Sequence, residues 1–205
     1  MPIAGPVLGS LILSQFAAVG FSGASAPKLS QAIGNGIVNN ILATAVYTGT
    51  STGLGLGSGT SIGVLTGGVV VGPLVGSLIF AQMTANSMTG VQSLQFSMAI
   101  GNAVGTHMST AIVQGVSTIV GIGAGTCKIV GVVGAAMSSM ILLQMTAFGL
   151  TGVSALQVAS AIGNGVSSAF AMSIVTTTIT GVAVGPVPPA FPPIPSVGTD
   201  TGKIF

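Results

Sequence analysis

Very few residues of this chain have side chains that could carry out chemistry, and the sequence keeps them apart. His107 is the only histidine, Cys127 the only cysteine and Asp200 the only acidic residue among 205. A nucleophile–base–acid triad or a catalytic carboxylate pair needs an acid near the other groups, and no Asp or Glu precedes position 200. A single thiol forms neither an intrachain disulfide nor a thiolate metal cluster. We therefore predict that the chain is not an enzyme and has no metal site and no cofactor.

The glycine-rich segments invite comparison with phosphate-binding loops. The most regular of them is Gly53-Leu-Gly-Leu-Gly-Ser-Gly59. A Walker-type loop needs a Lys followed by Ser or Thr, and a dinucleotide fingerprint needs an acidic residue about twenty positions later. Neither accompanies this segment. We interpret the glycines as packing positions and predict no small-molecule substrate.

A threefold internal repeat organises the sequence. Three similar segments read Ser10-Leu-Ile-Leu-Ser-Gln15, Ser77-Leu-Ile-Phe-Ala-Gln82 and Ser139-Met-Ile-Leu-Leu-Gln144. Twenty residues after each Gln, an Ala-Ile-Gly-Asn sequence ends at Asn35, Asn102 or Asn164. The copies are therefore offset by 67 residues (35 to 102) and then by 62 (102 to 164). Repeats of this length are typical of stacked or ring-like copies of one unit, none of which buries its apolar face alone.

Six amide side chains recur at two positions of the repeat: Gln15, Gln82 and Gln144, and Asn35, Asn102 and Asn164. A buried amide without a hydrogen-bond partner costs about 1–3 kcal/mol, so these groups need partners. We predict that they fix the register of helices around an approximate threefold axis, as a buried Asn does in coiled coils. The alternative is that they line a narrow channel. His107 does not recur, since its counterparts are Asn40 and Ala169, and we interpret it as a satisfied polar position on a helix.

Each copy contains two helical segments followed by an extended one. The stretch from Val7 to Val19 is apolar and ends near a glycine, and Ser25-Ala-Pro27 is a typical helix start. An apolar stripe then follows at four-residue intervals: Leu29, Ile33, Ile37 and Ile41. The later segments alternate glycine with small or β-branched residues, which favours extended backbone. We predict an α+β, mainly helical fold of three tandem helix–helix–extended-arm repeats, with pseudo-threefold or solenoid-like arrangement.

The last twenty residues depart from this pattern. Residues 186–195 include six prolines, which disfavour a helix and a central strand. We therefore place the repeats at 1–66, 67–132 and 133–185, followed by a Pro-rich extended C-terminal arm at 186–205. We expect Phe191, Ile194 and Phe205 to be buried against other chains and to anchor the subunit as an assembly arm.

Charge is almost absent from the chain. Three Lys, no Arg and one acidic residue give a net charge of +2, and charged residues make up 2%, against roughly a quarter in ordinary domains. The chain has no basic stripe, which excludes nucleic acid as a partner. A water-exposed monomer needs a charged surface, so most of this surface must contact protein or lipid.

The choice between protein and lipid depends on the length of the apolar runs. The run from Pro6 to Gly20 would span about 22 Å as a helix, less than the roughly 30 Å core of a bilayer. We predict a structural subunit buried in a large homo- or hetero-oligomeric particle, with other copies of itself and other particle subunits as partners. The alternative is a membrane-inserting pore or channel-forming protein located in a membrane.

The low charge, the Gly/Ser/Thr/Ala-rich repeat and the Pro-rich terminal arm resemble, in style across the whole chain, small structural proteins of tailed-bacteriophage particles. The tail and baseplate components are the most similar. The resemblance implies a virion location and a role as a hub, plug or membrane-contacting element, with a host membrane as a further partner. No family motif matches residue by residue, so the resemblance assigns no site residues.

Overall fold

The computed structural model of the chain describes residues 4–54, 57–67, 71–119, 122–173, 175–181 and 195–204. These residues form six helices and six strands. The helices are α1 (Gly5–Ala18), α2 (Ser25–Thr44), α3 (Gly72–Ala85), α4 (Val91–Ser109), α5 (Gly134–Ala147) and α6 (Val153–Met172). The strands are β1 (Val46–Leu54), β2 (Gly57–Thr66), β3 (Ile112–Ile119), β4 (Ile122–Val130), β5 (Val175–Gly181) and β6 (Pro195–Ile204). The predicted α+β, mainly helical fold class is confirmed.

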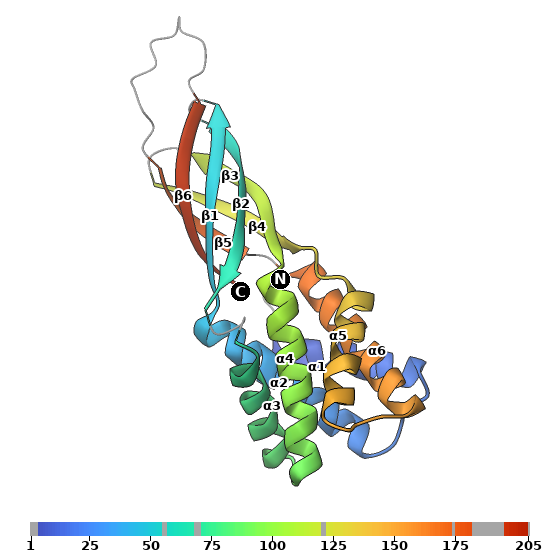
Figure 1. Cartoon of the computed structure of the whole chain (residues 1–205). Helices are drawn as coiled ribbons and strands as arrows, with labels where there is room; N and C mark the ends of the chain where they lie inside the picture. The colour runs from blue at the N-terminus through green and yellow to red at the C-terminus, as the bar shows by residue number, and fades with distance from the viewer. Residues whose placement is uncertain are drawn as a thin grey trace, which may run out of the picture.

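The six helices form a closed ring. Each helix packs against the next one in the sequence, and α6 packs against α1. Because the first and last helices meet, the arrangement is a ring and not an open solenoid. Figure 1 shows the strands stacked on one end of this ring. Each pair of helices is followed by a pair of strands, where we had predicted a single extended arm.

The strands form a closed antiparallel barrel in the order β1-β2-β3-β4-β5-β6. β1 pairs with β2 on one side and with β6 on the other, so every strand has two neighbours. Strands β1, β3 and β5 begin within three residues of the ends of α2, α4 and α6. The barrel and the ring are therefore joined by short connections, which keeps them stacked end to end.

The C-terminal segment differs from the prediction. We expected residues 186–205 to form an arm lying on other chains, but residues 195–204 form β6 and close this chain's own barrel. Pro195 takes the first position of the strand, where its missing N–H is tolerated. The third group of elements thus extends to Ile204 and does not end at 185. Residues 186–194 and the three predicted anchors, Phe191, Ile194 and Phe205, lie outside the described residues.

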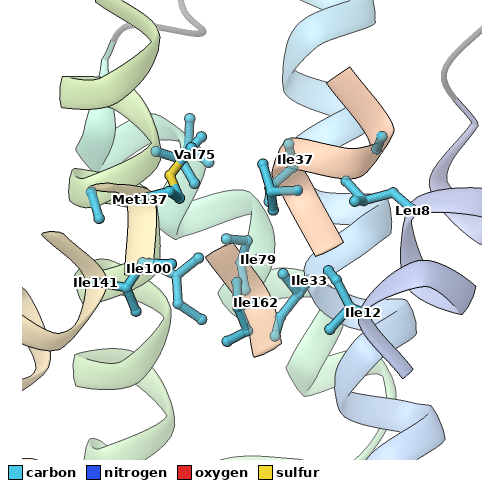
Figure 2. Close-up of a cluster of buried hydrophobic side chains, with 14 of the residues drawn as sticks. Leu8, Ile12, Ile33, Ile37, Val75, Ile79, Ile100, Met137, Ile141 and Ile162 are labelled. Atoms are coloured by element: carbon cyan, nitrogen blue, oxygen red, sulfur yellow. The ribbon is translucent and has the colours of Figure 1, made fainter. Parts of the chain in front are cut away.

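Isoleucine side chains fill the middle of the helix ring. Those of α1, α3 and α5 are Ile12, Ile79 and Ile141, and those of α2, α4 and α6 are Ile33, Ile100 and Ile162; all have no exposed surface. Figure 2 shows these side chains gathered between the helices, with Leu8, Val75, Met137 and Ile37 beside them. The axis of the ring is thus closely packed with apolar groups, as in other protein interiors.

Glycines allow the two helices of each pair to approach closely. A Cβ built on Gly34 of α2 would lie 2.5 Å from the backbone nitrogen of Gly9 and 2.6 Å from the carbonyl oxygen of Gly5, both in α1. Gly101 and Gly163 face the starts of α3 and α5 in the same way. A side chain at these positions would collide with backbone, so the spacing of each helix pair depends on glycine.

Tyr47 fills the end of the barrel that faces the helices. Its side chain has no exposed surface. A Cβ at Gly49 would lie 2.6 Å from Cζ of the ring, and one at Gly63 would lie 2.5 Å from Cε2. A barrel of six strands is narrower than the eight-stranded kind whose interior just holds side chains. Gly49 and Gly63 lack side chains, and the aromatic ring of Tyr47 therefore fits between the strands at this level of the barrel.

Candidate binding groove

The three loops that join the two helices of each pair have the same backbone geometry. The second residue after each first helix takes a left-handed conformation: Gly20 (φ 77°), Ser87 (φ 63°) and Gly149 (φ 76°). The next residue donates its N–H to a carbonyl five residues earlier, at 2.8–2.9 Å: Phe21 to Phe16, Met88 to Met83 and Leu150 to Met145. This helix-ending motif brings an apolar residue back against the helix. In the first loop the two aromatic rings meet edge to face, with centroids 4.9 Å apart.

An open groove of about 730 Å³ lies between these loops, at the end of the ring away from the barrel. Its floor is buried and consists of Met83, Met145, Ala155 and Val158. Its walls are half-buried and consist of Phe21, Leu29, Met88, Ser93, Phe96 and Leu150. Its rim is exposed and consists of Ser25, Ser87, Thr89, Gln92, Thr151 and Ser154.

All three helix pairs contribute equivalent positions to this groove. With the offsets of the sequence repeat, three sets of residues correspond: Phe21, Met88 and Leu150; Ser25, Gln92 and Ser154; Leu29, Phe96 and Val158. The groove therefore lies where the three pairs meet, on the axis of the ring. The predicted site residues, Gln15, Gln82, Gln144, Asn35, Asn102 and Asn164, are not among the residues that line it. One sequence signal could have indicated the groove. Each copy has an apolar residue two positions before the equivalent glycine, Gly23, Gly90 or Gly152.

The chemistry of the groove suits an uncharged apolar ligand. None of its lining residues carries a charge, and its floor and walls are mainly Met, Phe, Leu and Val. Met side chains are flexible and polarisable, so they adapt to different apolar surfaces. The volume falls within the roughly 300–1,000 Å³ that is usual for ligand pockets. The hydroxyl and amide groups of the rim could hydrogen-bond to a ligand's backbone.

The recurring Gln residues lie beside this end of the ring but do not line the groove. Gln15, Gln82 and Gln144 are half-buried near the ends of α1, α3 and α5. The backbone carbonyl of each accepts a hydrogen bond of 3.2 Å from the backbone N–H of the residue that follows the helix: Val19, Asn86 and Phe148. These backbone hydrogen bonds place the three Gln residues in the last turn of their helices.

The recurring Asn residues lie within the helix pairs. Asn35, Asn102 and Asn164 each face the first residue of the preceding helix, respectively Gly5, Gly72 and Gly134. A Cβ at Gly72 would lie 2.8 Å from Oδ1 of Asn102, and one at Gly134 would lie 2.5 Å from Oδ1 of Asn164. The structure therefore places these amides at pair contacts and not in a ring around the axis. Isoleucine occupies the axis, where an apolar side chain needs no hydrogen-bond partner.

His107 is a buried polar residue of α4 and is 5% exposed. Its Nε2 accepts a hydrogen bond from the backbone N–H of Val133 at 3.2 Å. The neutral ring then carries its proton on Nδ1, which has no partner among the described residues. Burial lowers the pKa of His107 below its usual value. We predicted that the polar groups of His107 would be hydrogen-bonded, but only one of its two ring nitrogens is. Asn40 occupies the equivalent position in the first copy, and its Nδ2 also lacks a hydrogen-bond partner among the described residues.

We expect the free energy of unfolding to decrease as the pH falls below about 6.5. A second proton would have to bind Nε2 of His107, which would then face the Val133 N–H as a second donor. Because the folded-state pKa is lowered from 6.5, the unfolded state binds more protons between that lowered value and 6.5, and stability is lost in this window. Denaturant unfolding measured between about pH 5 and pH 8 tests this.

The matched variant for this prediction is His107→Ala, which introduces the residue found at the equivalent Ala169. Its unfolding free energy should no longer change with pH across this range. An unchanged slope in the variant would assign the pH dependence to another group.

No protein-family model, curated protein or solved structure matches the chain. Within the ranges that the structure describes, no helix is long and apolar enough to cross a bilayer. In the same ranges, no three metal-ligating side chains come together. The function is therefore inferred from the surface, the core and the groove.

Proposed function

We propose that the chain is a non-enzymatic structural subunit of a large particle. In this proposal it acts as a hub or plug in the tail or baseplate of a bacteriophage virion. The three helix-pair and strand-pair groups are copies of one unit around an approximate threefold axis. One chain thus takes the place of a trimer. Its partners are other copies of itself and other subunits of the particle.

This proposal depends mainly on one observation: the outer surface of the helix ring has almost no charge and exposes large apolar side chains. Lys28 is the only Lys, Arg, Asp or Glu in all six helices. Large apolar side chains are exposed on the same surface, with exposed fractions between 55% and 76%: Val91, Leu143, Val153 and Leu156. Exposed apolar side chains on helices with almost no charge are typical of a surface that another protein covers.

The hydroxyl groups on this surface support coverage by protein. Ser10, Ser77 and Ser139 are exposed, and each donates to the carbonyl oxygen four residues earlier, at 2.8, 2.8 and 2.9 Å. Their donors are therefore satisfied within their own helices. A neighbouring subunit can cover these faces without leaving buried donors unpaired, which would otherwise cost free energy.

The filled core favours a plug over the alternative of a pore. A channel along the ring axis would have to displace Ile79, Ile100 and Ile162, which have no exposed surface. Removing such side chains from a core costs about 2–5 kcal/mol each. A conducting state would therefore need the helix ring to open.

The expected result for the purified chain is association in aqueous buffer with or without lipid. Light scattering should show large species, because the chain carries too little charge for electrostatic repulsion to keep the molecules apart. Dye-filled liposomes should not leak when the chain is added. A monodisperse monomer would contradict the structural-subunit proposal, and rapid leakage would favour the pore.

A matched variant tests whether the exposed apolar side chains cause the association. Changing Val91, Leu143, Val153 and Leu156 to Lys adds four positive charges on exposed positions of α4, α5 and α6. This variant should scatter less light at equal concentration. A variant with Ser10, Ser77 and Ser139 changed to Ala should associate as the parent chain does.

A further inference from the structure

The connection between β5 and β6 has an unusual sequence. Residues 182–194 read Val-Ala-Val-Gly-Pro-Val-Pro-Pro-Ala-Phe-Pro-Pro-Ile and contain no polar side chain. The corresponding connections in the other strand pairs are only residues 55–56 and 120–121. A two-residue turn is sufficient to join antiparallel strands. The additional residues of the third connection are therefore not needed for closing the barrel.

The axial groove has the complementary chemistry for such a segment. Proline-rich sequences bind grooves lined by aromatic side chains, where their restricted backbone limits the entropy lost on binding. Phe21 and Phe96 come from the first and second helix pairs and are walls of the groove, and Met83 and Met145 form its floor. Both the groove and the segment are uncharged. The hydroxyl groups of rim residues such as Ser25 and Thr151 could donate hydrogen bonds to backbone carbonyls of such a segment.

The segment cannot reach the groove of its own chain. Val175 and Ile204 pair at the barrel end beside the helices, so Gly181 and Pro195 lie at the other end of the barrel. The barrel and the ring each measure roughly 30 Å along the axis, from strands of nine or ten and helices of about twenty residues. A loop of residues 182–194 with both ends fixed extends at most about 23 Å from its base.

We infer that residues 182–194 of a second copy bind in the axial groove, so that copies associate head to tail along the axis. This inference rests on the proposed structural function and names the contact through which copies of the chain associate. A contact between two different surfaces of the same chain is heterologous and continues from copy to copy unless something stops it. The expected product is a linear stack, with the groove of one copy receiving the loop of the next.

Disulfide cross-linking between two differently labelled proteins tests the contact. Both carry Cys127→Ser, which removes the native thiol; one also carries Ala190→Cys in the loop and the other Ser93→Cys in the groove wall. Oxidation of the mixture should give a covalent heterodimer, and an excess of a synthetic peptide of residues 182–194 should suppress it at least severalfold. Ser139→Cys, exposed on the outer face of α5, replaces Ser93→Cys as the control and should give little product.

A chain that carries both Ala190→Cys and Ser93→Cys distinguishes the outcomes further. It should form a ladder of covalent multimers. A faster-migrating monomer with an internal disulfide, or equal yields with Ser93→Cys and Ser139→Cys, would overturn the inference. If liposomes and not a second copy protect Ser93→Cys from a thiol reagent, the groove binds lipid instead. Loss of the heterodimer while light scattering still shows association would reject this contact alone, whereas a monodisperse monomer would reject the proposed function.

Discussion

Deletion of residues 195–205 should open the barrel and cause loss of its cooperative unfolding. β6 pairs with β1 from Tyr47 to Leu54 and with β5 from Val175 to Gly181. Its removal leaves two unpaired strand edges, which are sites of intermolecular pairing and aggregation. Tyr47 would also lose the closed barrel end that buries it. Circular dichroism during heating should show a lower midpoint or no barrel transition, and backbone amides of β1 and β5 should exchange rapidly with solvent.

The matched control for this deletion keeps β6 and changes only the connection before it. Replacing residues 186–193 with a Gly/Ser sequence of equal length should leave the unfolding midpoint nearly unchanged, because Pro195–Ile204 still completes the barrel. Deleting Phe205 alone, which follows the strand, serves as a second control. If the 195–205 deletion unfolds at the same midpoint as the parent chain, closure by β6 does not stabilise the fold.

The substitution Gly101→Ala should destabilise the chain by about 3 kcal/mol or more. A Cβ at this position would lie 2.5 Å from the carbonyl oxygen of Gly72 and 2.5 Å from Cα of Gly76, and it would also collide with the Gly76 nitrogen. All of these atoms belong to the backbone of α3, so no side chain can move aside. The two helices must separate, which disturbs the packing of Ile79 and Ile100 behind them. Denaturant unfolding of the purified variant measures the loss.

Gly20→Ser is the matched control for a glycine substitution without a collision. A Cβ at Gly20 would meet nothing within 4 Å, although φ is 77°. The equivalent residue of the second helix pair is already a serine, Ser87, with φ of 63°. The cost should be about 1–2 kcal/mol, from the left-handed conformation alone. A comparable loss in both variants would show that close helix approach is not the reason for the Gly101 effect.

The helices could be predicted from the sequence because their signals are local. The apolar stretch Val7–Val19 corresponds to α1 at Gly5–Ala18, and the start signal at Ser25 coincides with the first residue of α2. The four-residue spacing of Ile33, Ile37 and Ile41 correctly marks a buried face. Such patterns depend only on which residues lie on one side of a helix.

The barrel and the groove could not be predicted because they depend on contacts between distant parts of the chain. Pairing of β6 with β1 joins Gly202 to Tyr47, and no local pattern specifies that pairing. The six prolines of residues 186–195, the last of which begins β6, indicate an end to regular structure, which misled the prediction of the C-terminus. The groove exists because three loops far apart in sequence meet at one end of the ring. The amides were predicted to converge on the axis, but a helix pattern alone does not say which neighbour a polar residue faces.

The equivalent but non-identical groove walls have a consequence for how a partner is oriented. A trimer of identical chains would offer a bound partner three rotational settings of equal energy. Phe21, Met88 and Leu150 occupy the same level of the groove but differ in size and shape. In a single chain with three different walls, the three rotational settings differ in energy. An asymmetric partner can therefore bind in one preferred orientation about the axis.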